Sequence, residues 1–503
     1  MGFRYYDWVA HHARAHGGNT AAIDLATQRR FTYTQWNERI DRLAGHLATL
    51  GVKKGERVGV LAPNTTDTLE AQFACFRLGA IFVPLNIRLT VHELEFILSD
   101  AGACALVYDQ EFDSMAHDLQ KRCGIGQILQ YGPQYEAAIA NAAPLGRHET
   151  VDMTDVSTIM YTSGTTGRPK GAMITHLMSF INCVNLGLPA RVTPLTVHLS
   201  VLPLFHTGGL NCYTNPVIHA GGAVIIMRAF DPGETLRLIG DPNIGVTHFF
   251  GVPSIYQFLC QHPAFAHTDV SRLQIAGVGG APMPVPLLKI WQERGLALMQ
   301  GYGMTETSPA VLALDPEDAA RKAGSTGKPV LHADVKIVDA EGAEVKPGEM
   351  GELWVKGPNI TPGYWNRPDA NKTSFTDGWL HTGDAARMDE EGFYYIVDRT
   401  KDMYISGGEN VYPAEVEDVL YQLPQIVEAA VIGAPDDTWG ETGMAIVAVK
   451  PGETLTEAQI IAHCRERLAR FKCPSRIAFV EALPRNATGK VHKPTLRQTF
   501  LEK

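Results

Sequence analysis

The sequence YTSGTTGRPKG, residues 161–171, decides the fold that we expect for this chain. It combines four serine and threonine hydroxyls, three glycines and two cations in a turn-prone segment. It directly follows VSTIM, residues 156–160, an apolar and β-branched run that is typical of a strand. Glycines let the backbone approach an oxyanion, hydroxyls add donors, and a lysine supplies positive charge. The pattern predicts a strand that leads into a phosphate-binding loop.

The loop differs from a Walker A motif, because no Gly-Lys-Ser/Thr sequence stands at that motif's spacing. A polar surface linker is the alternative interpretation, but a linker has no need of Arg168 and Lys170 beside Pro169. We therefore expect phosphate contacts from the hydroxyls, one glycine and the lysine of this segment, namely Thr162, Ser163, Gly164, Thr165, Thr166 and Lys170.

Length and composition bound the class of protein. A chain of 503 residues is too long for one ordinary core, and 45% hydrophobic with 19% charged residues is typical of globular proteins. The formal net charge of -10 argues against a general nucleic-acid binder, so an anionic substrate must meet locally placed cations.

The cysteines and the N-terminus indicate a cytoplasmic protein. The eight cysteines include no CxxC pair, which favours reduced thiols in the cytosol. The first residues carry no apolar signal core, and no apolar run is long enough to span a bilayer. We therefore expect no transmembrane anchor, although peripheral association with a membrane stays open.

The hydrophobic pattern predicts an α/β fold. Residues 33–50 and 66–78 have helical patterns, and each is followed by a strand-like run, at 57–62 and 80–85. After the loop, strand-like runs at 197–204, 223–227, 246–250 and 273–278 alternate with helix-like runs at 210–219, 232–239, 254–261 and 284–294. Such alternation makes doubly wound parallel sheets, with ligands beyond the carboxyl ends of the strands.

The pattern changes past about residue 323. Short strands replace the helices, which predicts a β-rich subdomain, and a small α+β segment with helices at 413–420 and 456–470 follows. We expect a large N-terminal domain over residues 1–399 and a small mobile C-terminal domain over residues 400–503, with a hinge near Lys401.

Three further segments carry polar groups at turns. GYGMTE, residues 301–306, offers an aromatic face, a hydroxyl and a carboxylate, and WLHTGD, residues 379–384, is followed by Asp398-Arg399. LPRNATGK, residues 483–490, places a lysine on a turn near the end of the chain. Each alone has an ordinary alternative: a glycine-hinged turn with a capping threonine, an Asp-Arg salt bridge, and a solvated lysine.

Together with the loop, these segments resemble the adenylate-forming superfamily, which includes acyl-CoA synthetases, firefly-type luciferases and peptide-synthetase adenylation domains. The resemblance covers residues 31–490. It rests on the phosphate loop, Phe205-His206, Gly280-Ala281-Pro282, Tyr302 to Glu306, Asp384, Arg399, residues 406–410 and residues 484–490.

The resemblance implies a two-step reaction. A carboxylate attacks the α-phosphorus of ATP and releases pyrophosphate, and the thiol of coenzyme A then displaces AMP from the acyl-adenylate. Such chemistry depends on preorganised positive charge more than on acid-base groups. The partners implied are a small carboxylic acid, ATP, Mg²⁺ and CoA, with a homodimer possible and no nucleic acid.

The same resemblance implies residue roles at the nucleotide. Tyr302 would stack on adenine, Gly280 and Ala281 would contact its edge, and Asp384 with Arg399 would bind ribose. The phosphate loop would hold the β- and γ-phosphates.

Further roles follow at the reacting groups. Thr305 would touch the α-phosphate, and Glu306 would hold Mg²⁺. Lys490 would bridge the carboxylate and the α-phosphate in the first step, and His206 would lie between the acyl pocket and the thiol entrance.

The small domain would rotate between the two steps about Lys401, with an ordinary interdomain turn as the alternative for this segment. Gly407 and Gly408 would then line the pantetheine tunnel while Lys490 swings out.

The acid itself is less constrained by the sequence. His206 stands where relatives that activate amino acids carry Asp, which argues against an amino-acid substrate. The segments expected to line the pocket offer no Arg or Lys to pair with a second carboxylate, which argues against a dicarboxylic acid. Four glycines leave room for a chain or a ring, and Asn211 and Tyr256 either bind a phenolic hydroxyl or satisfy backbone groups. The glycines are Gly208, Gly209, Gly277 and Gly279.

These residues favour a medium- or long-chain fatty acid first and an aryl or arylpropenoic acid, such as coumarate or ferulate, second. An adenylation enzyme that loads a separate carrier protein, and a luciferase-like oxidase, are the rivals from other classes.

Overall fold

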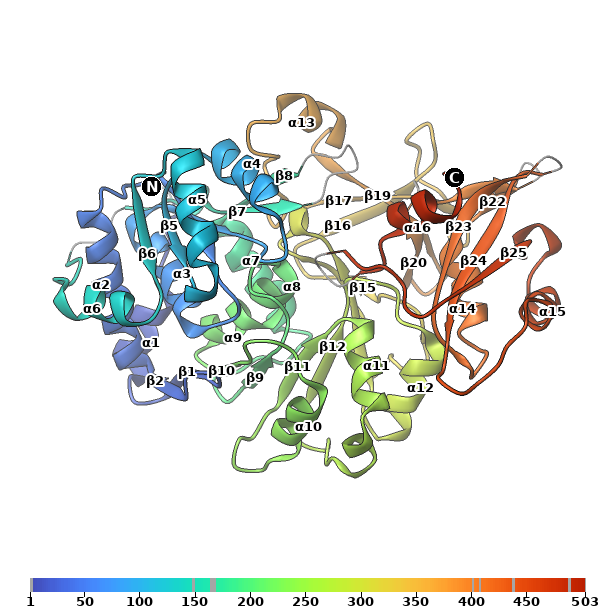
Figure 1. Cartoon of the computed structure of the whole chain (residues 1–503), viewed down its shortest axis with the longest axis horizontal. Helices are drawn as coiled ribbons and strands as arrows, with labels where there is room; N and C mark the ends of the chain where they lie inside the picture. The colour runs from blue at the N-terminus through green and yellow to red at the C-terminus, as the bar shows by residue number, and fades with distance from the viewer. Residues whose placement is uncertain are drawn as a thin grey trace.

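The computed structural model describes residues 3–146, 150–162, 169–399, 402–406, 409–436, 439–486 and 490–502, with the backbone alone at Arg399 and Asn410. Figure 1 shows the chain passing from the N-terminal sheets, at the left and centre, to a C-terminal sheet at the right. Among the described residues, no helix combines the length and the apolar character that a membrane crossing requires.

The first sheet has six strands in the order β6-β5-β3-β4-β7-β8. All neighbours pair in parallel except β7 and β8, which form an antiparallel pair around the expected phosphate loop. Its strands are β3 (Arg57–Leu61), β4 (Ile81–Pro84), β5 (Ala103–Tyr108), β6 (Gln127–Gln130), β7 (Val156–Thr162) and β8 (Lys170–Thr175). The helices of this part are α1 (Trp8–His16), α2 (Tyr33–Thr49), α3 (Thr66–Leu78), α4 (Val91–Ala101), α5 (Asp113–Cys123) and α6 (Pro133–Asn141), with the 3₁₀ turn η1 (Gln110–Phe112).

The second sheet has nine strands in the order β15-β14-β13-β12-β11-β9-β10-β1-β2. Its six central strands are parallel, so the carboxyl ends of β9, β11, β12 and β13 meet at one edge. The strands are β1 (Thr20–Asp24), β2 (Arg29–Thr32), β9 (Val197–Ser200), β10 (Ala223–Ile226), β11 (His248–Gly251), β12 (Ile275–Val278), β13 (Leu298–Gly303), β14 (Ala310–Ala313) and β15 (Lys328–Pro329).

The helices that accompany this sheet follow the expected alternation with one exception. The run expected as one helix over 210–219 is a π-helical turn, η2 (Leu210–Thr214), followed by α9 (Asn215–Ala220). The other elements are α7 (His176–Gly187), α8 (Thr207–Gly209), α10 (Pro232–Gly240), α11 (Pro253–Gln261), η3 (Pro263–His267), α12 (Val285–Glu293) and η4 (Thr305–Thr307).

Helix α3 lies between the two sheets. It packs against β1 of the nine-stranded sheet, against β3 and β4 of the six-stranded sheet, and every one of its residues is buried. Burial on all sides encloses its charged residues as well, including Glu70, whose side chain is 0% exposed. Charges in such a position require partners.

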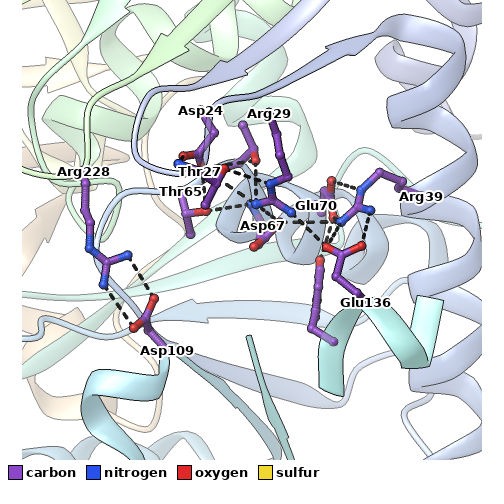
Figure 2. A network of polar contacts seen from close by, with 12 residues as sticks. Asp24, Thr27, Arg29, Arg39, Thr65, Asp67, Glu70, Asp109, Glu136 and Arg228 are labelled. Carbon is purple, nitrogen blue, oxygen red and sulfur yellow. Dashed lines mark hydrogen bonds and ion pairs between the residues drawn. The ribbon is translucent and has the colours of Figure 1, made fainter. Parts of the chain in front are cut away.

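Figure 2 shows the ion network that supplies these partners. Arg39 of α2 makes two bonds to the Glu70 carboxylate, at 2.7 and 3.1 Å, and Tyr135 donates to the same group at 2.8 Å. Arg29 of β2 pairs with Asp67 at 2.8 Å, and Asp24 of β1 accepts from the Thr65 hydroxyl at 2.9 Å. Removing one member would leave a buried charge unpaired, so the network fixes how the two sheets dock.

A β-rich layer follows the second sheet, as the sequence predicts. Five strands pair in antiparallel fashion in the order β16-β17-β19-β18, with β20 alongside β19. They are β16 (Asp334–Val338), β17 (Met350–Lys356), β18 (Phe375–Thr376), β19 (Trp379–Met388) and β20 (Tyr394–Arg399), with α13 (Pro368–Ser374) before β18.

The C-terminal part is a small α+β unit. Its core is a long antiparallel pair, β23 (Ile426–Asp436) and β24 (Gly440–Val449). The amide of Gln257 in α11 donates to the Val427 carbonyl at 2.6 Å, so this unit contacts the large sheet region. The remaining elements are β21 (Tyr404–Ser406), β22 (Glu409–Val411), β25 (Arg476–Val480), α14 (Pro413–Leu420), α15 (Glu457–Arg467), η5 (Arg470–Lys472) and α16 (Lys493–Phe500).

The architecture confirms the α/β fold class, with large sheets, a β-rich layer and a small C-terminal unit. The domain boundary at residues 399 and 400 stays a prediction. Lys401, the expected hinge, and Gly407 and Gly408, expected at the pantetheine tunnel, lie outside the described residues.

Candidate active site

The predicted phosphate loop joins β7 to β8. Thr162 and Lys170 are cross-strand partners at its two ends, and the Thr162 hydroxyl donates to the Lys170 carbonyl at 3.4 Å. The strand that the sequence predicts before the loop is therefore present. Ser163, Gly164, Thr165 and Thr166 lie outside the described residues.

Tyr364 contacts both Lys170 and Glu306. The Lys170 ammonium lies 5.2 Å from the centre of the Tyr364 ring, and the Tyr364 hydroxyl donates to Glu306 Oε1 at 2.8 Å. Thr305 and Glu306 form the turn η4 directly after β13, and both are buried. Sequence reasoning missed Tyr364, because its only signal is an aromatic residue after a loop glycine.

The Glu306 carboxylate has the chemistry expected of a Mg²⁺ ligand. Hard carboxylate oxygens suit Mg²⁺, which usually takes one or two carboxylates together with substrate phosphates. Within the described parts of the chain no cluster of three or more His, Cys, Asp or Glu side chains could hold a metal ion alone. Glu306 would therefore hold Mg²⁺ in company with phosphate oxygens.

Tyr302 and Asp384 lie side by side, although 82 residues separate them in the chain. The Tyr302 hydroxyl donates to Asp384 Oδ2 at 2.5 Å, from the end of β13 to β19. Arg399 is the cross-strand partner of Asp384 on β20, and its side chain is outside what the structure describes. Tyr302, expected at adenine, and Asp384, expected at ribose, are therefore in direct contact.

Lys490 reaches the same region from the C-terminal unit. Its Cε lies 3.8 Å from where a β-carbon on Gly280 would stand, just past the carboxyl end of β12. Gly280 has a φ of +81°, in the left-handed region that glycine tolerates, and Ala281 beside it is exposed. The Lys490 amide donates to Asn486 Oδ1 at 3.0 Å, which ties the lysine to Asn486.

His206 follows β9 at the same edge of the sheet. Burial, and secondarily the charge of Lys490, lower the pKa of His206 to about 4. The imidazole is therefore neutral at pH 7. Its Nδ1 accepts from the Gly208 amide at 3.3 Å, so the ring proton resides on Nε2.

Asn211 and Tyr256, the two candidate ligands for a phenolic hydroxyl, have partners within the protein, and the alternative that they satisfy backbone groups holds for Tyr256 alone. The Tyr256 hydroxyl donates to the Gly277 carbonyl at 2.8 Å, and Asn211 Oδ1 accepts from Asn215 at 2.8 Å. Each group therefore has at least one partner inside the protein, as buried polar groups usually do.

The glycines on this side are required by close packing more than by open space. A β-carbon on Gly209 would lie 2.2 Å from the Pro203 carbonyl oxygen, and one on Gly277 would lie 2.5 Å from the Tyr213 hydroxyl. On Gly279 the nearest atom would be the Gly301 carbonyl oxygen, at 3.0 Å. At Gly208, by contrast, a β-carbon would meet only ordinary contacts, with Leu202 at 3.6 Å and His206 at 3.7 Å.

The candidate ligand residues lie at the ends of strands, and the C-terminal unit contributes Lys490. This arrangement is typical of a nucleotide-binding α/β enzyme. Residues 9–365 match the AMP-binding enzyme family, and residues 415–490 match the AMP-binding enzyme C-terminal domain. The chain belongs to the AMP-binding enzyme family, and the resemblance to adenylate-forming enzymes is confirmed.

Among its relatives is a feruloyl-CoA synthase of an Amycolatopsis species, 42% identical over 98% of both chains. A long-chain-fatty-acid–CoA ligase of Mycobacterium tuberculosis, FadD13, is 37% identical over 95% of both chains. The structure of o-succinylbenzoate coenzyme A synthetase from Bacillus subtilis in complex with ATP and magnesium ion is 34% identical, with a TM-score of 0.87, covering 98% of this chain and 99% of that one.

Proposed function

We propose that this AMP-forming acid–CoA ligase activates an arylpropenoic acid of the coumarate and ferulate class. The observation that carries the proposal is the 42% identity to feruloyl-CoA synthase, against 37% to the long-chain fatty-acid ligase. The fatty acid, which the residue pattern favoured first, therefore takes second place to the aryl alternative.

The acyl side of the site supports an aromatic substrate. The rings of Tyr213 and Phe250 lie edge to face with centroids 5.4 Å apart, and both adjoin the position where Gly277 lacks a side chain. Aromatic walls favour another ring in edge-to-face or offset contact.

In the first step, the acid's carboxylate oxygen attacks the α-phosphorus of ATP, and the bond to pyrophosphate breaks. The carboxylate is already ionised, so this step needs no general base. Lys490 would neutralise charge on the carboxylate and the α-phosphate, with Gly280 leaving room for that approach. Lys170 and Thr162 would face the departing phosphates, and Mg²⁺ bound at Glu306 would supply further positive charge.

At the nucleoside, Tyr302 would stack on adenine while its hydroxyl orients Asp384 toward ribose. In the second step, the sulfur of CoA attacks the acyl carbonyl carbon, the bond to AMP breaks, and the thiol loses its proton. His206 is neutral in this structure and would orient groups at the thiol entrance by donating from Nε2. Rotation of the C-terminal unit about Lys401 between the two steps belongs to the same proposal.

The test is a substrate panel. The purified protein is given ATP, Mg²⁺ and CoA with cinnamic, coumaric, ferulic and indoleacetic acids and with fatty acids of medium and long chain, and AMP and acyl-CoA are measured. We expect kcat/KM for the hydroxycinnamic acids to exceed that for any fatty acid by about tenfold or more, because each well-fitted pocket contact contributes on this scale.

Higher turnover of a fatty acid would contradict the aryl proposal while leaving the ligase class intact. Pyrophosphate release that CoA cannot convert to acyl-CoA, but that a phosphopantetheinylated carrier protein can discharge, would favour the carrier-loading alternative.

A further inference from the structure

One buried polar group on the acyl side has no partner. The Tyr213 side chain is 1% exposed, and its hydroxyl forms no hydrogen bond with any described residue. Buried hydroxyls are nearly always satisfied, because leaving one unpaired in the folded protein is costly. Several other buried groups among the described residues also have no partner, so the case for Tyr213 depends on where its hydroxyl lies.

Tyr213 is on η2, the π-helical turn between α8 and α9. Such turns are often found at functional sites, since the inserted residue redirects side chains that a regular helix would aim elsewhere. Burial raises the pKa of Tyr213 well above its ordinary value, so its hydroxyl keeps its proton and can donate.

The hydroxyl adjoins the strand that leads to the reaction centre. It lies 2.5 Å from where a β-carbon on Gly277 would stand, and Gly280, beside Lys490, follows three residues later. Strand β12 ends at Val278, and three residues of chain span at most about 10 Å. That is comparable to the length of a trans-propenoate with a para-substituted ring, from its carboxylate to the para oxygen.

The neighbouring polar groups do not compete for this role. Tyr256 bonds the Gly277 carbonyl and packs in the core cluster with Ala276 and Val278, on the opposite face of β12 from Tyr213. Phe250 adjoins both Gly277 and Gly279. The Tyr213 ring also lies edge to face with the rings of His198 and His248, and neither histidine bonds its hydroxyl.

We propose that the Tyr213 hydroxyl donates a hydrogen bond to the para oxygen of the aryl substrate and selects hydroxylated arylpropenoic acids over those without this oxygen. This inference rests on the proposed function. A fatty acid or unsubstituted cinnamic acid would leave the hydroxyl unpaired, and sites built to bond a substrate hydroxyl discriminate strongly against analogues that lack it.

The experiment compares kcat/KM for coumaric and cinnamic acid in the native enzyme and in Tyr213→Phe. We expect the native enzyme to favour coumaric acid by about tenfold or more, and the ratio to fall to within about threefold of one in the variant, since it reports one buried hydrogen bond. Tyr256→Phe is the matched control, because it removes a hydroxyl beside the same glycine on the other face, and its ratio should match the native one.

A second measurement needs no variant and guards against misfolding of Tyr213→Phe. In the native enzyme, 4-methylcinnamic acid fills the para position without an oxygen and should be used about as poorly as cinnamic acid. Turnover of 4-methylcinnamic acid at the coumaric acid rate would overturn the inference.

Two failures can be told apart. If arylpropenoic acids are substrates but Tyr213→Phe keeps the native ratio, the role of Tyr213 is wrong and the proposed function stands. If the native enzyme turns over no arylpropenoic acid, the proposed function fails and the inference fails with it.

Discussion

The nucleotide side and the acyl side of the candidate active site are built from different kinds of residue. On the nucleotide side, polar residues at strand ends pair with one another, as Tyr302 does with Asp384 and Tyr364 with Glu306. On the acyl side, aromatic rings pack against strand glycines, and one hydroxyl, that of Tyr213, is unpaired among the described residues. The difference teaches that the candidate residues for the nucleotide come from short sequence motifs. The candidate residues for the acid lie on a surface that forms only when distant segments pack together.

Lys490→Ala should have the largest effect and should act on every acid alike. Losing one preorganised positive donor at the reacting phosphate typically costs about 10²- to 10³-fold in rate. Adenylate formation, measured as pyrophosphate release without CoA, should fall by this factor, whereas CoA should still discharge a synthetic acyl-adenylate.

The control for this prediction is Lys450→Ala, which removes an exposed lysine of the same C-terminal unit. Equal loss in both half-reactions of Lys490→Ala would contradict the assigned role of the lysine.

Gly277→Ala should have an intermediate effect that is confined to the acyl side. The new β-carbon would come within 2.5 Å of the Tyr213 hydroxyl and 2.8 Å of Phe250 Cδ2, so the aromatic wall must shift. Overpacking of this kind costs about 1–3 kcal/mol, and kcat/KM for the acid should fall about tenfold or more while the KM for ATP holds.

Gly187→Ala serves as the matched control, because a β-carbon there meets nothing within 4 Å. A comparable rise in the KM for ATP in Gly277→Ala would show that the two sides are not separable.

Tyr302→Phe should have the smallest effect and should appear only on the nucleotide side. It keeps the ring for stacking and removes the hydroxyl that donates to Asp384 at 2.5 Å. The KM for ATP should rise about threefold to tenfold, the scale of one hydrogen bond, in initial-rate measurements at saturating acid. A changed ratio of kcat/KM between coumaric and cinnamic acid in this variant would contradict the separation of the nucleotide side from the acyl side.

Much of the fold could be predicted from the sequence, because alternating runs with glycine and proline at their ends carry the βα pattern locally. The strand before the phosphate loop and the turn at residues 301–306 are where the motifs indicate. The π-helical turn at Leu210–Thr214 could not be predicted, since its apolar pattern reads as one continuous helix with the residues after it.

The acyl side was harder to predict for a physical reason. Asn211 and Tyr256 were candidate phenol ligands, but the fold gives both a partner within the protein. Tyr213 lies two residues beyond Asn211, and its hydroxyl is one of several buried groups that have no hydrogen-bond partner among the described residues. Which hydroxyl is satisfied depends on neighbours that are distant in the chain, and no local pattern records them.

The residue order alone was enough to establish the α/β class, the adenylate-forming family and the motif residues, because strand ends, glycine turns and phosphate-binding groups are short and local. Only the tertiary structure decided that Lys490 stands beside Gly280, that Tyr302 bonds Asp384, and that the Tyr213 hydroxyl adjoins Gly277 and has no hydrogen-bond partner in the described part of the chain. Each of these is a contact between segments far apart in sequence, formed when sheets and helices pack, and no local pattern records such contacts.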